Sequence, residues 1–282
     1  DAILQIAPLP SNYTNNIQYS QIIFARIEDG INCYGINTVQ LVVYELPKVQ
    51  TSEEFIYCLN EYPSTITLNA GLLNGAFNEF YYNWSTGQTT SEIQINVPGT
   101  YSVIVTNTNG CSKTRTLTIL PSSSATIEVV DVFDGVENNS VTINVSGEGN
   151  YEYALDDELN GYQDSNLFSM VSPGFHTVYI RDKNGCGIVE KTISVIGFPK
   201  FFTPNGDGFN DTWHVNGINT PNQINSDVYI FDRFGKLLIQ LNALGGGWDG
   251  TYNGTMLPNS DYWFYVNLPD NRIFKGHFTL KR

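Results

Sequence analysis

The chain alternates apolar and polar residues over short stretches, which turn-forming residues separate. Clear examples are IIFARI from residue 22, YSVIVT from residue 101 and HTVYIR from residue 176. A period of two places successive side chains on opposite faces of a β-strand. Helix-favouring residues are scarce, whereas Thr, Asn, Ser, Tyr, Val and Ile dominate. The pattern therefore predicts an all-β protein.

Two-strand units that contain a cysteine recur along the chain. Each unit has an alternating strand, a short polar turn, a cysteine and a second strand, and the cysteines are Cys33, Cys111 and Cys186. They are spaced 78 (111 − 33) and 75 (186 − 111) residues apart. A repeat of this length is too long for a solenoid and predicts tandem modules, each a small immunoglobulin-like β-sandwich.

Short linkers that contain proline separate the predicted modules, around Pro47, Pro121 and Pro199. Proline stiffens such joints, which predicts a semi-rigid spacer. Residue 1 falls inside a patterned segment, so we expect the chain to be part of a longer protein. The predicted domains are a truncated immunoglobulin-like module at 1–47, immunoglobulin-like modules at 48–121 and 122–198, and a different C-terminal β-sandwich at 199–282.

The module at 48–121 carries the order Cys58, Trp84, Cys111. This order resembles an immunoglobulin core, in which a buried indole packs against a disulfide. We therefore predict a Cys58–Cys111 disulfide that closes a loop of about 54 residues, with two buried free thiols as the alternative. Cys33 is expected to pair upstream of the first residue. Cys186 is expected to be a buried free thiol or, alternatively, the partner of Cys33.

The aromatic residues Tyr81, Tyr82 and Trp84 allow two interpretations. They could form a platform that stacks sugar rings, as in a carbohydrate-binding module. They could instead fill the core and pack across strands, which is ordinary for aromatic residues at strand spacing. We favour the core interpretation.

Charge and motifs exclude several functional classes. The net charge is −14 and the 14 basic residues are scattered, which argues against nucleic acid or an anionic membrane as a partner. No apolar run approaches the roughly 18 residues of a membrane helix. Catalytic motifs such as HExxH and GxSxG are missing, and His176, His214 and His277 stand isolated. The acidic cluster at 156–158 is typical of a solvated turn, so we predict no enzyme.

Four motifs follow one another in the last predicted domain: FTPNGDGFNDTW, FDRFGK, WDGTYNGTMLPNSDYWFYV and FKGHFTLKR. Together they resemble the gliding-motility-associated C-terminal domain, which is the type B sorting domain of type IX secretion system cargo in Bacteroidetes. The resemblance implies export across the outer membrane to the cell surface. It also implies recognition by the translocon and by an outer-membrane partner of the PorP/SprF family.

The segments YEYALDD and FHTVYIRDKNGCG, upstream of that domain, resemble the last repeat of large surface adhesins of the SprB type. This resemblance implies the stalk and secretion signal of an adhesin used in gliding and attachment. The alternative is the carbohydrate-binding β-sandwich tail of a secreted hydrolase, which would take a surface polysaccharide as its partner.

The chain ends in a predicted strand at 273–280. Apolar residues (Phe274, Phe278, Leu280) alternate there with polar ones (Lys275, His277, Thr279, Lys281). A terminal strand can present a sheet edge to another chain. The candidates for translocon recognition are Lys275, His277, Lys281 and Arg282; the alternative is a solvated face whose lysines prevent aggregation.

The loop NGDGFND offers oxygen donors at alternate positions. The side chains of Asn205, Asp207 and Asp211 and the carbonyl of Phe209 match the ligands that Ca²⁺ selects. No glutamate stands at the twelfth position, so Asn210 or Asp249 would have to complete the site. The alternative is purely structural, because Asn-Gly and Asp-Gly steps form tight turns on their own.

Overall fold

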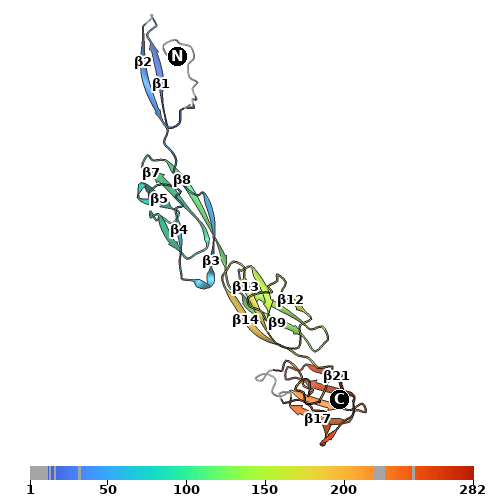
Figure 1. Cartoon of the computed structure of the whole chain (residues 1–282). Helices are drawn as coiled ribbons and strands as arrows, with labels where there is room; N and C mark the ends of the chain where they lie inside the picture. The colour runs from blue at the N-terminus through green and yellow to red at the C-terminus, as the bar shows by residue number, and fades with distance from the viewer. Residues whose placement is uncertain (1–11, 13, 16, 31–32, 219–225, 243–244) are drawn as a thin grey trace. The chain divides into compact units, whose positions relative to one another are not determined.

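The computed structural model describes residues 12, 14–15, 17–30, 33–218, 226–242 and 245–282. Strands are the dominant regular elements of the described residues, beside two short 3-10 helices, Leu59–Glu61 and Phe77–Glu79. The all-β prediction is therefore confirmed. Figure 1 shows the strands gathered into separate sheets along the chain.

Contacts divide the chain into two compact units. The first is Asp1–Tyr57 with Glu61–Leu120, and the second is Cys58–Asn60 with Pro121–Arg282. The finer division into four modules stays a prediction, and part of the module at 1–47 lies outside the described residues.

The first strands that the structure describes in the first unit form an antiparallel hairpin of β1 (Ser20–Glu28) and β2 (Tyr34–Val42). Apolar side chains of this hairpin, such as Phe24 and Ile27, are more than half exposed. The hairpin forms a two-stranded sheet of its own.

A β-sandwich follows in the first unit. Trp84 and Leu117 lie in its core, where the alternating residues of the strands meet. Arg115 is also fully buried and pairs with Glu53. The larger sheet has the order β3 (Ser52–Cys58), β8 (Ser112–Ser122), β7 (Gly99–Asn107), β5 (Phe80–Trp84), and the smaller one pairs β4 (Ile66–Asn69) with β6 (Glu92–Ile95).

The second unit contains another sandwich, built from two three-stranded sheets. Their inner faces share one buried cluster, to which Val141, Ile143, Val178 and Ile180 contribute. One sheet has the order β12 (Leu167–Ser169), β10 (Ser140–Ser146), β9 (Thr126–Phe133), and the other β11 (Tyr151–Leu155), β13 (Gly174–Asp182), β14 (Ile188–Val195).

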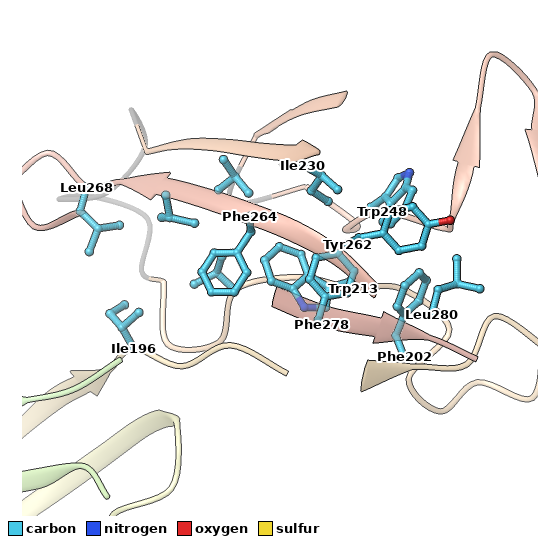
Figure 2. Packing of buried hydrophobic residues seen from close by; sticks show 13 residues of the cluster. Ile196, Phe202, Trp213, Ile230, Trp248, Tyr262, Phe264, Leu268, Phe278 and Leu280 are labelled. Carbon is cyan, nitrogen blue, oxygen red and sulfur yellow. The ribbon is translucent and has the colours of Figure 1, made fainter. Parts of the chain in front are cut away.

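The C-terminal part of this unit is a five-stranded sheet with one face on a large aromatic core. Trp213 stacks on Phe278 with ring centroids 4.3 Å apart, and Trp248 and Phe264 pack around them (Figure 2). Trp248 is therefore the apolar anchor of its glycine-rich segment. The sheet order is β15 (Phe201–Phe202), β21 (Ile273–Leu280), β20 (Ser260–Asn267), β16 (Asp227–Phe231), β17 (Leu237–Asn242), and a small hairpin joins β18 (Thr251–Tyr252) to β19 (Thr255–Met256).

Candidate functional site

The disulfide joins different cysteines from those that the sequence predicts. Cys58, at the end of β3, is bonded to Cys186, in the turn between β13 and β14, with the Cα atoms 5.3 Å apart. Cys111 and Cys33 are free thiols. The predicted Cys58–Cys111 bridge is therefore wrong, and so are both predictions for Cys186.

The surroundings of the cysteines explain this correction. The Sγ atom of Cys111 lies 4.0 Å from the carbonyl oxygen of Tyr44, where the chain enters its sandwich. Asn60 lies two residues after Cys58. Its side chain donates a hydrogen bond to the carbonyl oxygen of Cys186 and accepts one from the N–H of Ser124. Cys111 therefore belongs to the first unit, whereas Cys58 and Cys186 both belong to the second.

A buried carboxylate shapes the turn that holds Cys186. Asp182 is 2% exposed and accepts hydrogen bonds from the Ser122 hydroxyl and from the backbone N–H groups of Asn150 and Cys186. Burial would raise the pKa of this carboxyl, but the hydrogen bonds together outweigh burial and lower it. The side-chain oxygen of Asn107 accepts the N–H of Cys111 in the same way, four residues before the cysteine.

The terminal strand β21 has the two faces that the sequence predicts. Phe278 and Leu280 are buried, whereas Lys275 and His277 are exposed. The strand lies between β20 and β15, and β15 pairs in parallel with its last residues. β20 thus pairs with all of β21 on one edge, and β15 covers the other edge at Thr279 and Leu280.

The structure separates the four residues predicted to meet the translocon. Lys275 lies over the ring of Tyr265, and His277 lies beside Trp263. Lys281 contacts the ring of Phe201. Arg282 instead bonds the backbone carbonyls of Leu257 and Gly250. Lys275 and His277 thus share the solvent face of the sheet, whereas Arg282 holds the chain end in place.

Aromatic residues that the sequence analysis did not consider complete this solvent face. The strand register aligns Tyr229 with Tyr265 and Phe231 with Trp263 across β16 and β20. These residues alternate with the buried ones in each strand, so the strand period could have revealed them. An open depression of about 490 Å³ lies here, lined by Phe231, Asp232, Arg233, Gly235, Trp263, Phe264, Tyr265, Lys275 and Gly276.

The loop predicted to bind calcium is closed by its own backbone. The carboxylate of Asp211 accepts N–H groups from Asn205, Gly206 and Gly208 at 2.7 to 3.0 Å. Bonds from the Gly206 and Gly208 amides, and then from Asn205, lower the pKa of this carboxyl. The Asp207 carboxylate accepts the N–H of Phe209 in turn.

These oxygens therefore hold the turn, which fits a calcium site poorly. Asp249, the proposed distant ligand, accepts hydrogen bonds from Thr251 instead. Within the described ranges, no three His, Cys, Asp or Glu residues are grouped as a metal site requires. Calcium binding stays a prediction.

One of the three histidines has an acidic partner. His176 is largely buried, with Nδ1 2.6 Å from Asp156 Oδ2 and Nε2 2.7 Å from the carbonyl oxygen of Ser172. Asp156 also accepts the N–H of Thr177. Both ring nitrogens are thus engaged in fixing a loop. The sequence interpretation of 156–158 as a solvated turn missed this pair, because the partners lie 20 residues apart.

Trp84 is 2% exposed and its indole N–H donates to the carbonyl oxygen of Thr90. Tyr82 is also buried, whereas Tyr81 is 70% exposed. The core interpretation is confirmed for Trp84 and Tyr82, and neither can stack on a sugar.

Comparisons with known proteins agree with this organisation. Residues 196–280 match the CHU_C type IX secretion signal domain, and residues 1–47 match the Flavobacterium inter-domain disulphide bond domain. A search of curated proteins gave no match. None of the described helices is long and apolar enough to span a membrane.

A search of solved structures found several chains with a limited similarity to this one. Domains 1–5 of Sidekick-1 are 10% identical over 92% of this chain and 65% of that chain, with a TM-score of 0.38. Three titin immunoglobulin domains are 8% identical over 84% of this chain and 99% of that chain, with a TM-score of 0.37. Murine CEACAM1b is 11% identical over 53% of this chain and 100% of that chain, with a TM-score of 0.36.

The match at residues 196–280 confirms the resemblance of the C-terminal domain to a type IX sorting domain. The protein is cargo of a type IX secretion system, exported across the outer membrane to the cell surface. Its C-terminal domain therefore interacts with the secretion machinery.

Proposed function

We propose that this chain is the stalk and secretion signal of a large surface adhesin that serves attachment and gliding. The carrying observation is the order of parts: immunoglobulin-like sandwiches precede a C-terminal domain that matches a type IX secretion signal. Modules in series on proline-stiffened linkers hold a distal part away from the surface. The proposed outer-membrane partner belongs to the PorP/SprF family.

The disulfide supports a mechanical role for these modules. It links Cys58 to Cys186, which are 128 positions apart in the sequence. A covalent bond therefore reinforces the non-covalent contacts between these two distant segments. Disulfides persist in oxidising compartments outside the cytoplasm, which agrees with the export route. A stalk under load and outside the cell benefits from such a bond.

Deletion of residues 199–282 tests the proposed function. We expect the truncated chain, produced behind a periplasmic signal peptide in a gliding bacterium with a type IX system, to stay inside the cell with the Cys58–Cys186 bond formed. Protease accessibility on intact cells measures surface exposure, and attachment and gliding on glass measure the adhesin role. Normal surface exposure of the truncated chain would contradict the secretion role, and unchanged attachment and gliding would contradict the adhesin role.

The alternative is the carbohydrate-binding tail of a hydrolase. Of the three aromatic residues first considered, Tyr81 is the one exposed enough to contact a sugar. Polysaccharide binding by the purified chain that is lost on Tyr81→Ala, without a change in thermal stability, would favour this alternative.

A further inference from the structure

We propose that the secretion machinery reads this domain through the solvent face of its five-stranded sheet, and that the surface docking there is an acidic polypeptide. We define this aromatic–cationic face by the residues Tyr229, Phe231, Trp263, Tyr265, Lys275 and His277. The inference rests on the proposed function and names the site and the chemistry of the partner.

Strand register builds the face from two adjacent rows. One row joins Tyr229, Tyr265 and Lys275, and the other joins Phe231, Trp263 and His277. Alternate residues of the same strands, such as Phe264 and Phe278, point into the core instead (Figure 2). Because the core fixes these strands from below, the two rows form a rigid, preformed surface.

Trp263 is the exposed aromatic side chain through which the face can contact a partner. Its side chain is 40% exposed on a sheet whose other face is fully packed. It lines the depression of about 490 Å³ together with Arg233 and Lys275. Aromatic and arginine side chains in a central pocket are the residues that contribute most to protein–protein affinity.

Four cations of this domain contact aromatic rings. Lys275 Nζ lies 5.3 Å from the centre of the Tyr265 ring, and the Arg233 guanidinium lies 4.8 Å from that of Phe234. Lys236 and Lys281 lie similarly over Tyr252 and Phe201. Across the described part of the chain, none of these four cations forms an ion pair.

Nearby carboxylates are engaged inside the domain. Asp232 accepts the N–H groups of Phe234 and Lys236 in its own turn. Asp261 accepts the hydroxyl of Thr279 on the neighbouring strand. Lys275 and Arg233 therefore have no ion pair within the described residues, and a carboxylate-rich surface complements these two cations.

The charge distribution along the chain makes this complementarity selective. Residues 199–282 contain seven basic and seven acidic residues, so the whole net charge of −14 belongs to residues 1–198. An acidic receptor is repelled by the upstream modules but not by the C-terminal domain, whose basic and acidic residues balance. This difference in net charge between residues 1–198 and 199–282 therefore directs an acidic receptor to the C-terminal domain.

The same contacts favour a polypeptide over a saccharide. A sugar stacks on a flat ring face, but the ring of Tyr265 is already covered by Lys275, and Tyr229 and Phe231 are only partly exposed. The exposed residues of the face are Trp263, Lys275 and His277. The Lys275 ammonium pairs with a carboxylate, a group that a neutral sugar lacks and an acidic polypeptide offers.

Export of the full chain tests the proposal. In a type IX bacterium, we expect the double variant Trp263→Ala, Lys275→Glu to reach the surface at least tenfold less than the parent chain. Phe209→Ala and Lys191→Glu are the matched controls, since both residues are exposed and lie outside the face. We expect both controls, and the conservative Lys275→Arg, to be exported normally. The melting temperature of each purified chain verifies that it folds.

The outcomes separate this proposal from the proposed function. If deletion of 199–282 blocks export but the folded double variant is exported normally, the face is not the recognition site and the secretion role stands. If the deleted chain is exported, both are wrong. If the purified chain binds polygalacturonate, loses that binding on Trp263→Ala and is still exported, the face is a saccharide site and the polypeptide proposal is overturned.

Discussion

At the scale of single residues, Asp211 decides how the chain enters the C-terminal domain. Its carboxylate accepts hydrogen bonds from three backbone N–H groups of the preceding turn. Without this acceptor, these N–H groups would have to bond to water. Ionised acceptors make stronger hydrogen bonds than neutral ones. The short motif that suggests a metal site is thus explained by the needs of its own backbone.

The lowered pKa of Asp211 predicts a defined pH dependence. The folded pKa lies below the unfolded value of about 3.9, so the carboxylate stabilises the loop above that pH, and this contribution is lost as the pH falls through the folded pKa. We expect the amide resonances of Gly206 and Gly208 to titrate together below about pH 3.9. NMR between acidic and neutral pH measures this.

In Asp211→Asn we expect the same resonances to show no titration in that range. An unchanged titration in the variant would assign the effect to another group. A response of these resonances to CaCl₂ at neutral pH would instead support the calcium prediction.

At the scale of elements, β21 shows what local pattern can and cannot predict. The alternation of Phe278 and Leu280 with Lys275 and His277 follows from strand period and is confirmed. The pairing of β21 with β15 was not predicted, because β15 is two residues long and lies far away in sequence. Short parallel pairings are set by tertiary contacts and leave no periodic signal.

Gly276 makes room for the aromatic core within β21. A Cβ atom at this position would lie 2.7 Å from the ring of Phe264, its register partner on β20. We expect Gly276→Val to destabilise the C-terminal domain by roughly 1 to 3 kcal/mol, as overpacking of a core does. Thermal unfolding followed by tryptophan fluorescence measures this, because Trp213 and Trp248 lie in that core.

His277→Val is the matched control, since it places the same side chain on the same strand but on the solvent face. We expect its melting temperature to stay close to that of the parent chain. Equal losses in both variants would show that strand propensity rather than the ring contact is responsible.

At the scale of the whole molecule, the repeats predict the architecture but mislead about cysteine pairing. The turn that contains Cys111 recurs around Cys186, with Asn107 and Asp182 in the same role. Equivalent turns should have equivalent partners, so a bridge within one module ought to recur in the next. Cys58 has no counterpart there, since Phe133 stands one 75-residue period later (58 + 75 = 133). The missing counterpart of Cys58 in the next repeat therefore indicated, from the sequence alone, a disulfide between repeats.

The Cys58–Cys186 bond also determines which part of the chain can stretch. Tension applied at the two termini passes through the bond, so the residues between the cysteines, 128 positions apart, carry no load while it is intact. Those residues are about 430 Å long when fully extended. In single-molecule pulling, we expect the measured extension to lack this length under oxidising conditions and to gain it after reduction. The chain is therefore a tether whose maximum extension depends on the redox state.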